Sequence, residues 1–156
     1  MKRKCAALSL IWAACLLVVA SAAAQDRAAA SSVRFAALDV YVDSSAPLAA
    51  WQFELSERRG RMTVVGVENG DSAAFANAPR YDLAAVQRGD AERIIVADFS
   101  LDPAARLPVG ATRVATIHVR LRGAEEPDYE LRLIAAGDAA GQRIDASIRL
   151  SPEEGR

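Results

Sequence analysis

Hydrophobic and polar residues alternate with a period of two through much of the chain from Val33 onward. The clearest example is the stretch VATIHVRLRG, where small or apolar residues fall at every second position. Successive side chains of a β-strand point to opposite faces, so this pattern predicts a strand with one buried face. The residues expected to point inward are Ala115, Ile117, Val119 and Leu121.

Three further stretches, WQFELS, RIIVADF and YELRLIAAG, are predicted to be strands that bury large or apolar side chains. RIIVADF is apolar on both faces, and we assign its odd-numbered residues to the core. The three inward sets are Trp51, Phe53 and Leu55; Ile95, Ala97 and Phe99; and Tyr129, Leu131 and Leu133.

Seven or eight short stretches of this kind follow one another over residues 33–150. Turn-forming pairs such as Asn69-Gly70, Asp102-Pro103 and Glu126-Pro127 separate them. Short strands at regular spacing indicate one all-β domain, an antiparallel β-sandwich. The stretch YDLAAVQRGDAE has room for one helical turn but not for a second layer.

The first 24 residues have the features of a secretory signal peptide. Basic residues 2–4 precede an apolar run from Cys5 to about Ala20, and SAAAQ offers a cleavage site after Ala24. We therefore predict a secreted or periplasmic protein, with a flexible lead-in at residues 25–32 and a disordered tail at 151–156. The alternatives are an uncleaved leader, the only expected contact with a membrane, and a lipoprotein attached through Cys15.

Composition excludes several kinds of function. Both cysteines lie in the leader, so the mature chain has no disulfide, no thiol nucleophile and no Cys–His metal site. Loss of the leader removes three of the 19 basic residues and none of the 20 acids, which changes the net charge from −1 to −4. A mildly acidic chain is a poor candidate for binding nucleic acid, because that binding depends on neutralising phosphates.

No pattern of catalytic or metal-binding residues is present. His118 is the only histidine, and no Gly-x-Ser-x-Gly motif supplies a nucleophile to accompany it. The acidic groups near strand ends, Asp98 with Asp102 and Glu68 with Asp71, lack the spacing of a calcium-binding loop. We therefore expect no enzymatic activity, no cofactor and no metal site.

Five stretches, in order, give the sequence a resemblance to the cohesin domain family over about residues 33–150. They are LAAWQFELS, MTVVGVENGD, RIIVADFS, LPVGATRVATIHVRLRG and YELRLIAAGDAAGQRI. The resemblance implies a nine-stranded, jelly-roll-like sandwich, related to carbohydrate-binding modules, with a protein-binding role. In cellulosome cohesins, one sheet face binds a calcium-loaded dockerin, and typical binders carry an Asn and an Asp two residues apart there. This sequence has Ala50 and Gln52 at those positions, which argues against dockerin as the partner.

The sheet layout of that family brings WQFELS, RIIVADF and YELRLIAA into one sheet. Its outer side would then be an apolar patch with a charged rim, as is usual for a recognition surface. An equally weighted alternative is that the loop at residues 71–92 covers Ile94 and Val96. The candidate binding face consists of Ala50, Gln52, Glu54, Ile94, Val96, Asp98, Arg132 and Ile134.

These observations favour a secreted, non-enzymatic module that binds a protein partner through a sheet face. One alternative is a carbohydrate-binding module, which would need Tyr41 or Tyr81 to stack on a polysaccharide. Another is a structural subunit of a cell-surface assembly that pairs through strand edges.

Overall fold

Nearly all regular structure in the described part of the chain is β-strand, as the period of two predicts. This computed structural model describes residues 32–152, so the leader and most of the lead-in lie outside the described residues. Within that range there are seven strands: β1 (Val33–Ser44), β2 (Ala50–Glu57), β3 (Met62–Asn69), β4 (Arg93–Phe99), β5 (Gly110–Arg122), β6 (Tyr129–Gly137) and β7 (Ala146–Pro152).

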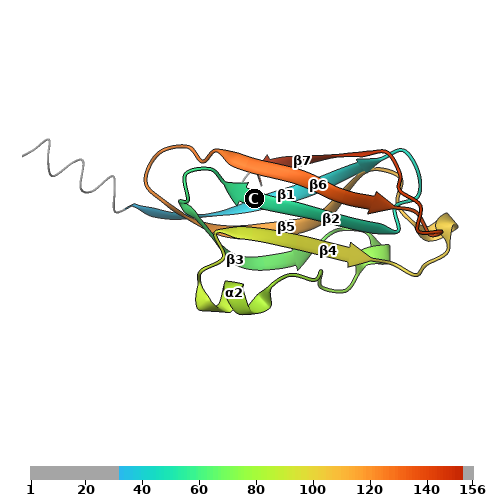
Figure 1. The fold of residues 1–156 in the computed structure, drawn as a ribbon, viewed down its shortest axis with the longest axis horizontal. Coiled ribbons are helices and arrows are strands. Elements are labelled where there is room, and N and C mark those ends of the chain that lie inside the picture. Colours follow the sequence, from blue (N-terminus) through green and yellow to red (C-terminus); the bar gives the residue numbers. More distant parts are fainter. Residues whose placement is uncertain (1–31, 153–156) are drawn as a thin grey trace, which may run out of the picture. The chain divides into compact units, whose positions relative to one another are not determined.

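The strands form two sheets, with the order β3-β5-β1-β7 in one and β4-β2-β6 in the other (Figure 1). The pairs β1–β7, β2–β4, β2–β6 and β3–β5 are all antiparallel. Residues 34–121 and 126–152 form one compact unit that contains both sheets. A small second unit includes residues 32–33 and 122–125, where the Gly123 N–H donates to the Ser32 carbonyl at 2.8 Å. The predicted β-sandwich is confirmed.

The seven strands agree with the seven or eight stretches of the sequence pattern and are fewer than the nine that the family resemblance implies. Two further residues form isolated β-bridges. Arg80 bridges to Ala97 on the outer edge of β4, and Arg143 bridges to Gly137 beside β6. At the C-terminal end, β7 extends two residues beyond Leu150, where the pattern predicts the last strand to end. Ser151 pairs with Asp39, so this residue belongs to the sandwich and not to the predicted tail.

The core lies between the inner faces of the two sheets. The phase of a strand is the choice of which alternate side chains point inward. It was predicted correctly for β2 and β5, since Trp51, Phe53, Leu55 and the inward residues of β5 are all buried. Trp51 stacks on Phe53 at 5.6 Å between ring centroids and meets Phe75 edge-on at 6.0 Å. The ring of Phe75, from the connection between β3 and β4, therefore fills a side of the core that the strands leave open.

The predicted phase of β4 is wrong. Ile94 and Val96 are 4% and 0% exposed, whereas Ile95 and Phe99 are 40% and 50% exposed. Their cross-strand partners explain the difference, since Val96 lies opposite Phe53 and Ile94 lies opposite Leu55, both of which point inward. Residues directly opposite each other share a face, so pairing with β2 fixes a phase that the two-sided apolar sequence left open.

The expected helical turn is α2 (Leu83–Arg88), which is packed beside β3. The side chain of Asp82 caps its N-terminus by accepting the Ala85 N–H, and Gly89 ends it with a φ of 74°. Within the described residues, none of the helices has the length and hydropathy needed to span a membrane.

Candidate functional site

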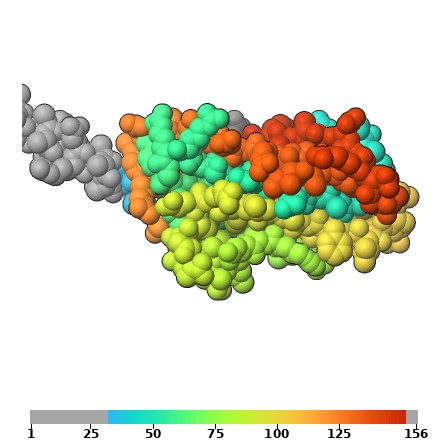
Figure 2. Space-filling view, in the orientation of Figure 1, coloured from blue at the N-terminus to red at the C-terminus, as the bar shows by residue number. Residues whose placement is uncertain are grey.

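The outer face of the β4-β2-β6 sheet combines small, apolar and charged side chains. Figure 2 shows this face, with β6 in orange, β2 in green and β4 in yellow running side by side. Register and burial place three groups of side chains on it, one from each strand. They are Arg93, Ile95, Ala97 and Phe99 from β4; Ala50, Gln52, Glu54 and Ser56 from β2; and Glu130, Arg132, Ala135 and Gly137 from β6.

The structure brings together only part of the candidate face predicted from the sequence. Ala50, Gln52, Glu54 and Arg132 do lie on the outer side. Ile134 is the extra residue of a β-bulge, because Phe53 pairs with Leu133 and Gln52 pairs with Ala135, and it is half-buried.

The other three predicted residues are displaced from the outer face by the phase of β4. Ile94 and Val96 point into the core instead. The segment 71–92 does contribute to this core, as the alternative expected, since Phe75 and Ala91 belong to the same buried cluster as Ile94 and Val96. Asp98 is half-buried and lies opposite Trp51.

A carboxylate between two arginines occupies one part of the face. Glu54 accepts a hydrogen bond from Arg132 at 2.8 Å and one from Arg93 at 3.3 Å, one on each carboxylate oxygen. The bond from Arg132 does most to hold the pKa of Glu54 below its usual value, and Arg93 adds to this against the opposing effect of desolvation. The three side chains span β4, β2 and β6 and make this part of the face polar.

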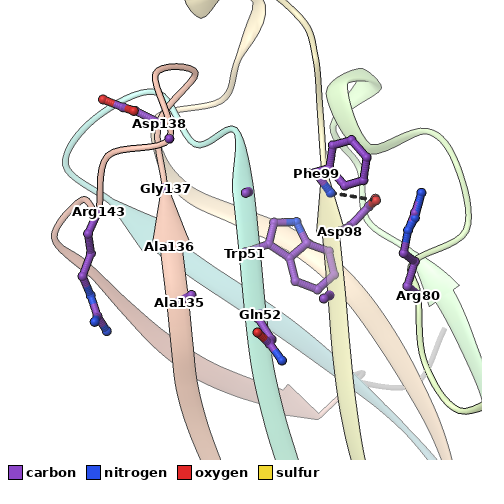
Figure 3. Close-up of a pocket in the computed structure, with 13 residues that line it drawn as sticks. Trp51, Gln52, Arg80, Asp98, Phe99, Ala135, Ala136, Gly137, Asp138 and Arg143 are labelled. Carbon is purple, nitrogen blue, oxygen red and sulfur yellow. Dashed lines mark hydrogen bonds between the residues drawn. The ribbon is translucent and has the colours of Figure 1, made fainter.

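Next to this ion cluster, the face is hollowed, with a volume of about 530 Å³. Cross-strand pairs arrange the surface here in two rows, Arg80–Ala97–Gln52–Ala135 and Phe99–Ala50–Gly137–Arg143. The floor is low because Ala97, Ala135, Ala50 and Gly137 occupy four positions of the two rows, with Gln52 the one longer side chain between them. Figure 3 shows Arg80 beyond β4 and Arg143 beyond β6, on opposite sides of the three strands.

The two arginines of the hollow differ from the two that hold Glu54. The Arg80 guanidinium lies 4.8 Å from the centroid of the Phe99 ring, and Arg143 donates to the backbone carbonyl of Ile134 at 3.2 Å. Within residues 32–152, neither forms an ion pair with a carboxylate. Both side chains are exposed, so their charges are available to another molecule.

Two carboxylates also line the hollow, and both accept hydrogen bonds from backbone N–H groups. Asp138 accepts them from Ala140 and Gln142, at 2.9 and 2.8 Å, within its own turn. Asp98 accepts one from Phe99 at 2.8 Å. Burial raises the pKa of Asp98, and the Phe99 N–H and the charge of Arg80 only partly offset this.

Residues considered for other chemistry make no second site. His118 Nε2 lies 3.0 Å from a carboxylate oxygen of Glu68, on the other sheet. Within the described residues, no three His, Cys, Asp or Glu side chains are grouped closely enough to hold a metal ion.

The two tyrosines considered for sugar stacking are both partly covered. Arg149 lies over the Tyr41 ring at 4.2 Å, and Tyr81 packs against the core. Polysaccharide binding stays a prediction.

Sequence reasoning missed Ile95, Phe99, Arg80 and Arg143 as face residues. The signal for Ile95 and Phe99 was present, since either phase of RIIVADF exposes large apolar side chains. No local pattern indicates that Arg80 and Arg143 continue the rows of the sheet, because each is placed by a single bridge.

Comparison with known proteins identifies the fold. No family model matches the chain, and no curated protein sequence does. Solved structures do match: a non-cellulosomal cohesin from the hyperthermophilic archaeon Archaeoglobus fulgidus has a TM-score of 0.51 at 11% identity, over 74% of this chain and 75% of the cohesin.

Two structures of cohesin–dockerin complexes from Clostridium thermocellum match similarly, each at 14% identity. The Coh-OlpC–Doc435 complex has a TM-score of 0.52 over 76% of this chain and 84% of the matched chain. The Coh-OlpA–Doc918 complex has a TM-score of 0.50 over 72% and 82%. The chain is thus a cohesin-like β-sandwich, as its sequence pattern indicated.

Proposed function

We propose that this protein is an exported, non-enzymatic module that binds another protein through the outer face of the β4-β2-β6 sheet. The observation that carries the proposal is the exposure of Ile95 and Phe99 on this face, beside a hollow with an alanine floor. Large apolar side chains next to a charged rim are the usual composition of a recognition surface. The cohesin-like fold supports the same function, since several structural neighbours were solved as complexes with dockerins.

A dockerin is not the partner that the face favours. The outer positions expected to carry an Asn and an Asp hold Ala50 and Gln52, and the charged group nearest them is Glu54 with its two arginines. We propose a different protein partner, met outside the cytoplasm after the leader directs export.

A pair of aspartate substitutions tests the proposed face. Ile95→Asp is expected to abolish co-purification of the natural partner, because it replaces an exposed apolar side chain of the face with a charge. Val65→Asp is the matched control, since Val65 is 43% exposed on the other sheet. Both variants should unfold at about the wild-type temperature. Equal loss of the partner in both, or retention in both, would show that the binding surface lies elsewhere.

A further inference from the structure

The hollow on the outer face has positive charge on two opposite sides and an apolar floor between them. Arg80 and Phe99 are at the β4 side, and Arg143 is at the β6 side. Each arginine lies at one end of a row of cross-strand neighbours, so the width of the three strands separates them. A bound group that contacts both must therefore be extended, with more than one acceptor.

The charges of the hollow select the kind of group that it accepts. Asp98 and Asp138 also line the hollow, so its formal charges balance, and their carboxylates accept backbone N–H groups. The two guanidinium groups are exposed and form no ion pair within residues 32–152, so their remaining N–H donors are free for a ligand. Guanidinium groups bind carboxylates in preference to other protein groups, often with two parallel hydrogen bonds. The free hydrogen-bonding capacity therefore matches an acidic ligand.

The floor of the hollow selects an apolar group. Ala50, Ala97, Ala135 and Gly137 carry no side chain longer than a methyl group, so a ligand can approach the backbone of the sheet closely. The volume of about 530 Å³ is within the range of small-molecule pockets, ample for a large side chain. The half-buried Gln52 lies in the floor and supplies an amide donor and acceptor.

We propose that this hollow binds an acidic peptide segment of the protein partner, with a large apolar side chain on the alanine floor and carboxylates on either side. Arg80 and Arg143 hold the carboxylates, and Phe99 packs against the apolar side chain. The inference rests on the proposed function of the face and specifies the chemistry of its partner.

Selection from a displayed library of random twelve-residue peptides, on the immobilised full chain at 150 mM NaCl, tests the inference. The selected peptides should be enriched in Asp and Glu on both sides of a Leu, Met, Phe or Trp. One selected peptide is then synthesised, together with a version in which lysine replaces each acid, and binding is followed by fluorescence anisotropy. The lysine version should not bind. Selection without acidic enrichment would overturn the proposal.

Arginine variants show where the peptide binds. Arg80→Gln and Arg143→Gln should each weaken binding of the synthetic peptide by about three- to tenfold, and the double variant by more. Arg149→Gln is the control, because Arg149 also lies over an aromatic ring but belongs to the other sheet. Unchanged binding to the double variant, or an equal loss with Arg149→Gln, would place the peptide elsewhere and contradict the proposal. Should a variant unfold, affinity of the wild type must still fall about tenfold between 50 and 500 mM NaCl.

The same variants separate this inference from the proposed function. If Ile95→Asp loses the natural partner but the arginine double variant keeps it, the face does bind a protein. The inference that the two arginines bind acidic residues of that partner is then wrong. If the arginine variants lose the acidic peptide but Ile95→Asp keeps the natural partner, the hollow does bind acidic peptides. The proposal that the natural partner binds through the exposed apolar side chains of this face is then wrong. Arginine-dependent retention on alginate, with no peptide selected, would identify an acidic polysaccharide and contradict a peptide ligand.

Discussion

At the scale of single residues, the most unusual group is the carboxylate of Glu57 at the end of β2. Its side chain is fully buried, yet it accepts hydrogen bonds from the backbone N–H groups of Arg61, Arg59 and Asp128, at 2.8, 3.1 and 3.3 Å. These bonds join the turn between β2 and β3 to the start of β6. Burial alone would raise the pKa of Glu57, but the three N–H groups and the charge of Arg61 outweigh it and lower the pKa.

The lowered pKa gives a prediction for stability against pH. A carboxyl with a lower pKa in the folded state stabilises the fold fully above its unfolded pKa, and this contribution is lost as pH falls through the folded value. Glu57→Gln should therefore cost about 2 kcal/mol at pH 7, and the cost should shrink as pH falls below about 4.5, the ordinary value. Urea unfolding at pH 7, 5 and 3 measures this. Glu130→Gln, at an exposed surface pair, is the control and should be nearly neutral.

Gly70 shows a second constraint at the residue scale. A Cβ at this position would lie 1.9 Å from the carbonyl oxygen of Arg113, closer than any real contact, and the obstacle is backbone. The adjacent Asp71 pairs with the Arg113 side chain, and Arg113 also lies 3.5 Å from Asp39 on β1. The end of β3 is thus held against β5 at a position that only glycine fits.

Alanine substitutions at two glycines of this region should have different effects. Gly70→Ala is expected to destabilise the fold by about 2 kcal/mol or more, because the backbone of β5 must move. Gly66→Ala should change stability little, since its nearest contact would be an ordinary 3.6 Å from His118. Thermal unfolding of both variants tests this. Similar melting temperatures for the two would show that the turn adapts without strain.

At the scale of elements, the strand β4 decides which side chains form the face. Ile94 and Ile95 are adjacent, and only register separates the buried one from the exposed one. Ile94→Ala should cost about 2–4 kcal/mol, the usual effect of removing buried methyl groups, while Ile95→Ala should cost less than about 1 kcal/mol. Urea unfolding of the two variants compares them directly. The reverse order would mean that the phase predicted from the sequence was correct after all.

The same element shows how far the sequence alone could lead. The phases of β2 and β5 were predictable because only one face of each strand is apolar. RIIVADF is apolar on both faces, so its phase depends on pairing with β2, which is distant along the chain. The hollow depends further on the bulge at Ile134 and on the bridges of Arg80 and Arg143. These are long-range features that no local period reveals.

At the scale of the whole molecule, the two sheets differ in what they present outward. On the β3-β5-β1-β7 sheet, the cluster of Asp39, Arg113 and Thr116 and the stack of Arg149 on Tyr41 join the outer side chains to one another. On the β4-β2-β6 sheet, Arg132 and Arg93 hold Glu54 and Arg80 lies over the Phe99 ring, but Arg80 and Arg143 form no ion pair with a carboxylate of residues 32–152. Both sheets expose large apolar side chains, Phe35 and Val65 on one and Ile95 and Phe99 on the other. The basis for proposing the β4-β2-β6 face is therefore its alanine-floored hollow with an arginine at each side.

Site-specific photo-cross-linking in cells that express the full chain tests this choice of face most directly. A benzophenone amino acid is placed at Gln52 or Ile95 on the proposed face, and at Tyr41 or His118 on the other sheet. We predict a discrete cross-linked protein from the first two positions and none from the second two. Cross-links from Tyr41 and His118 without any from Gln52 and Ile95 would contradict this prediction.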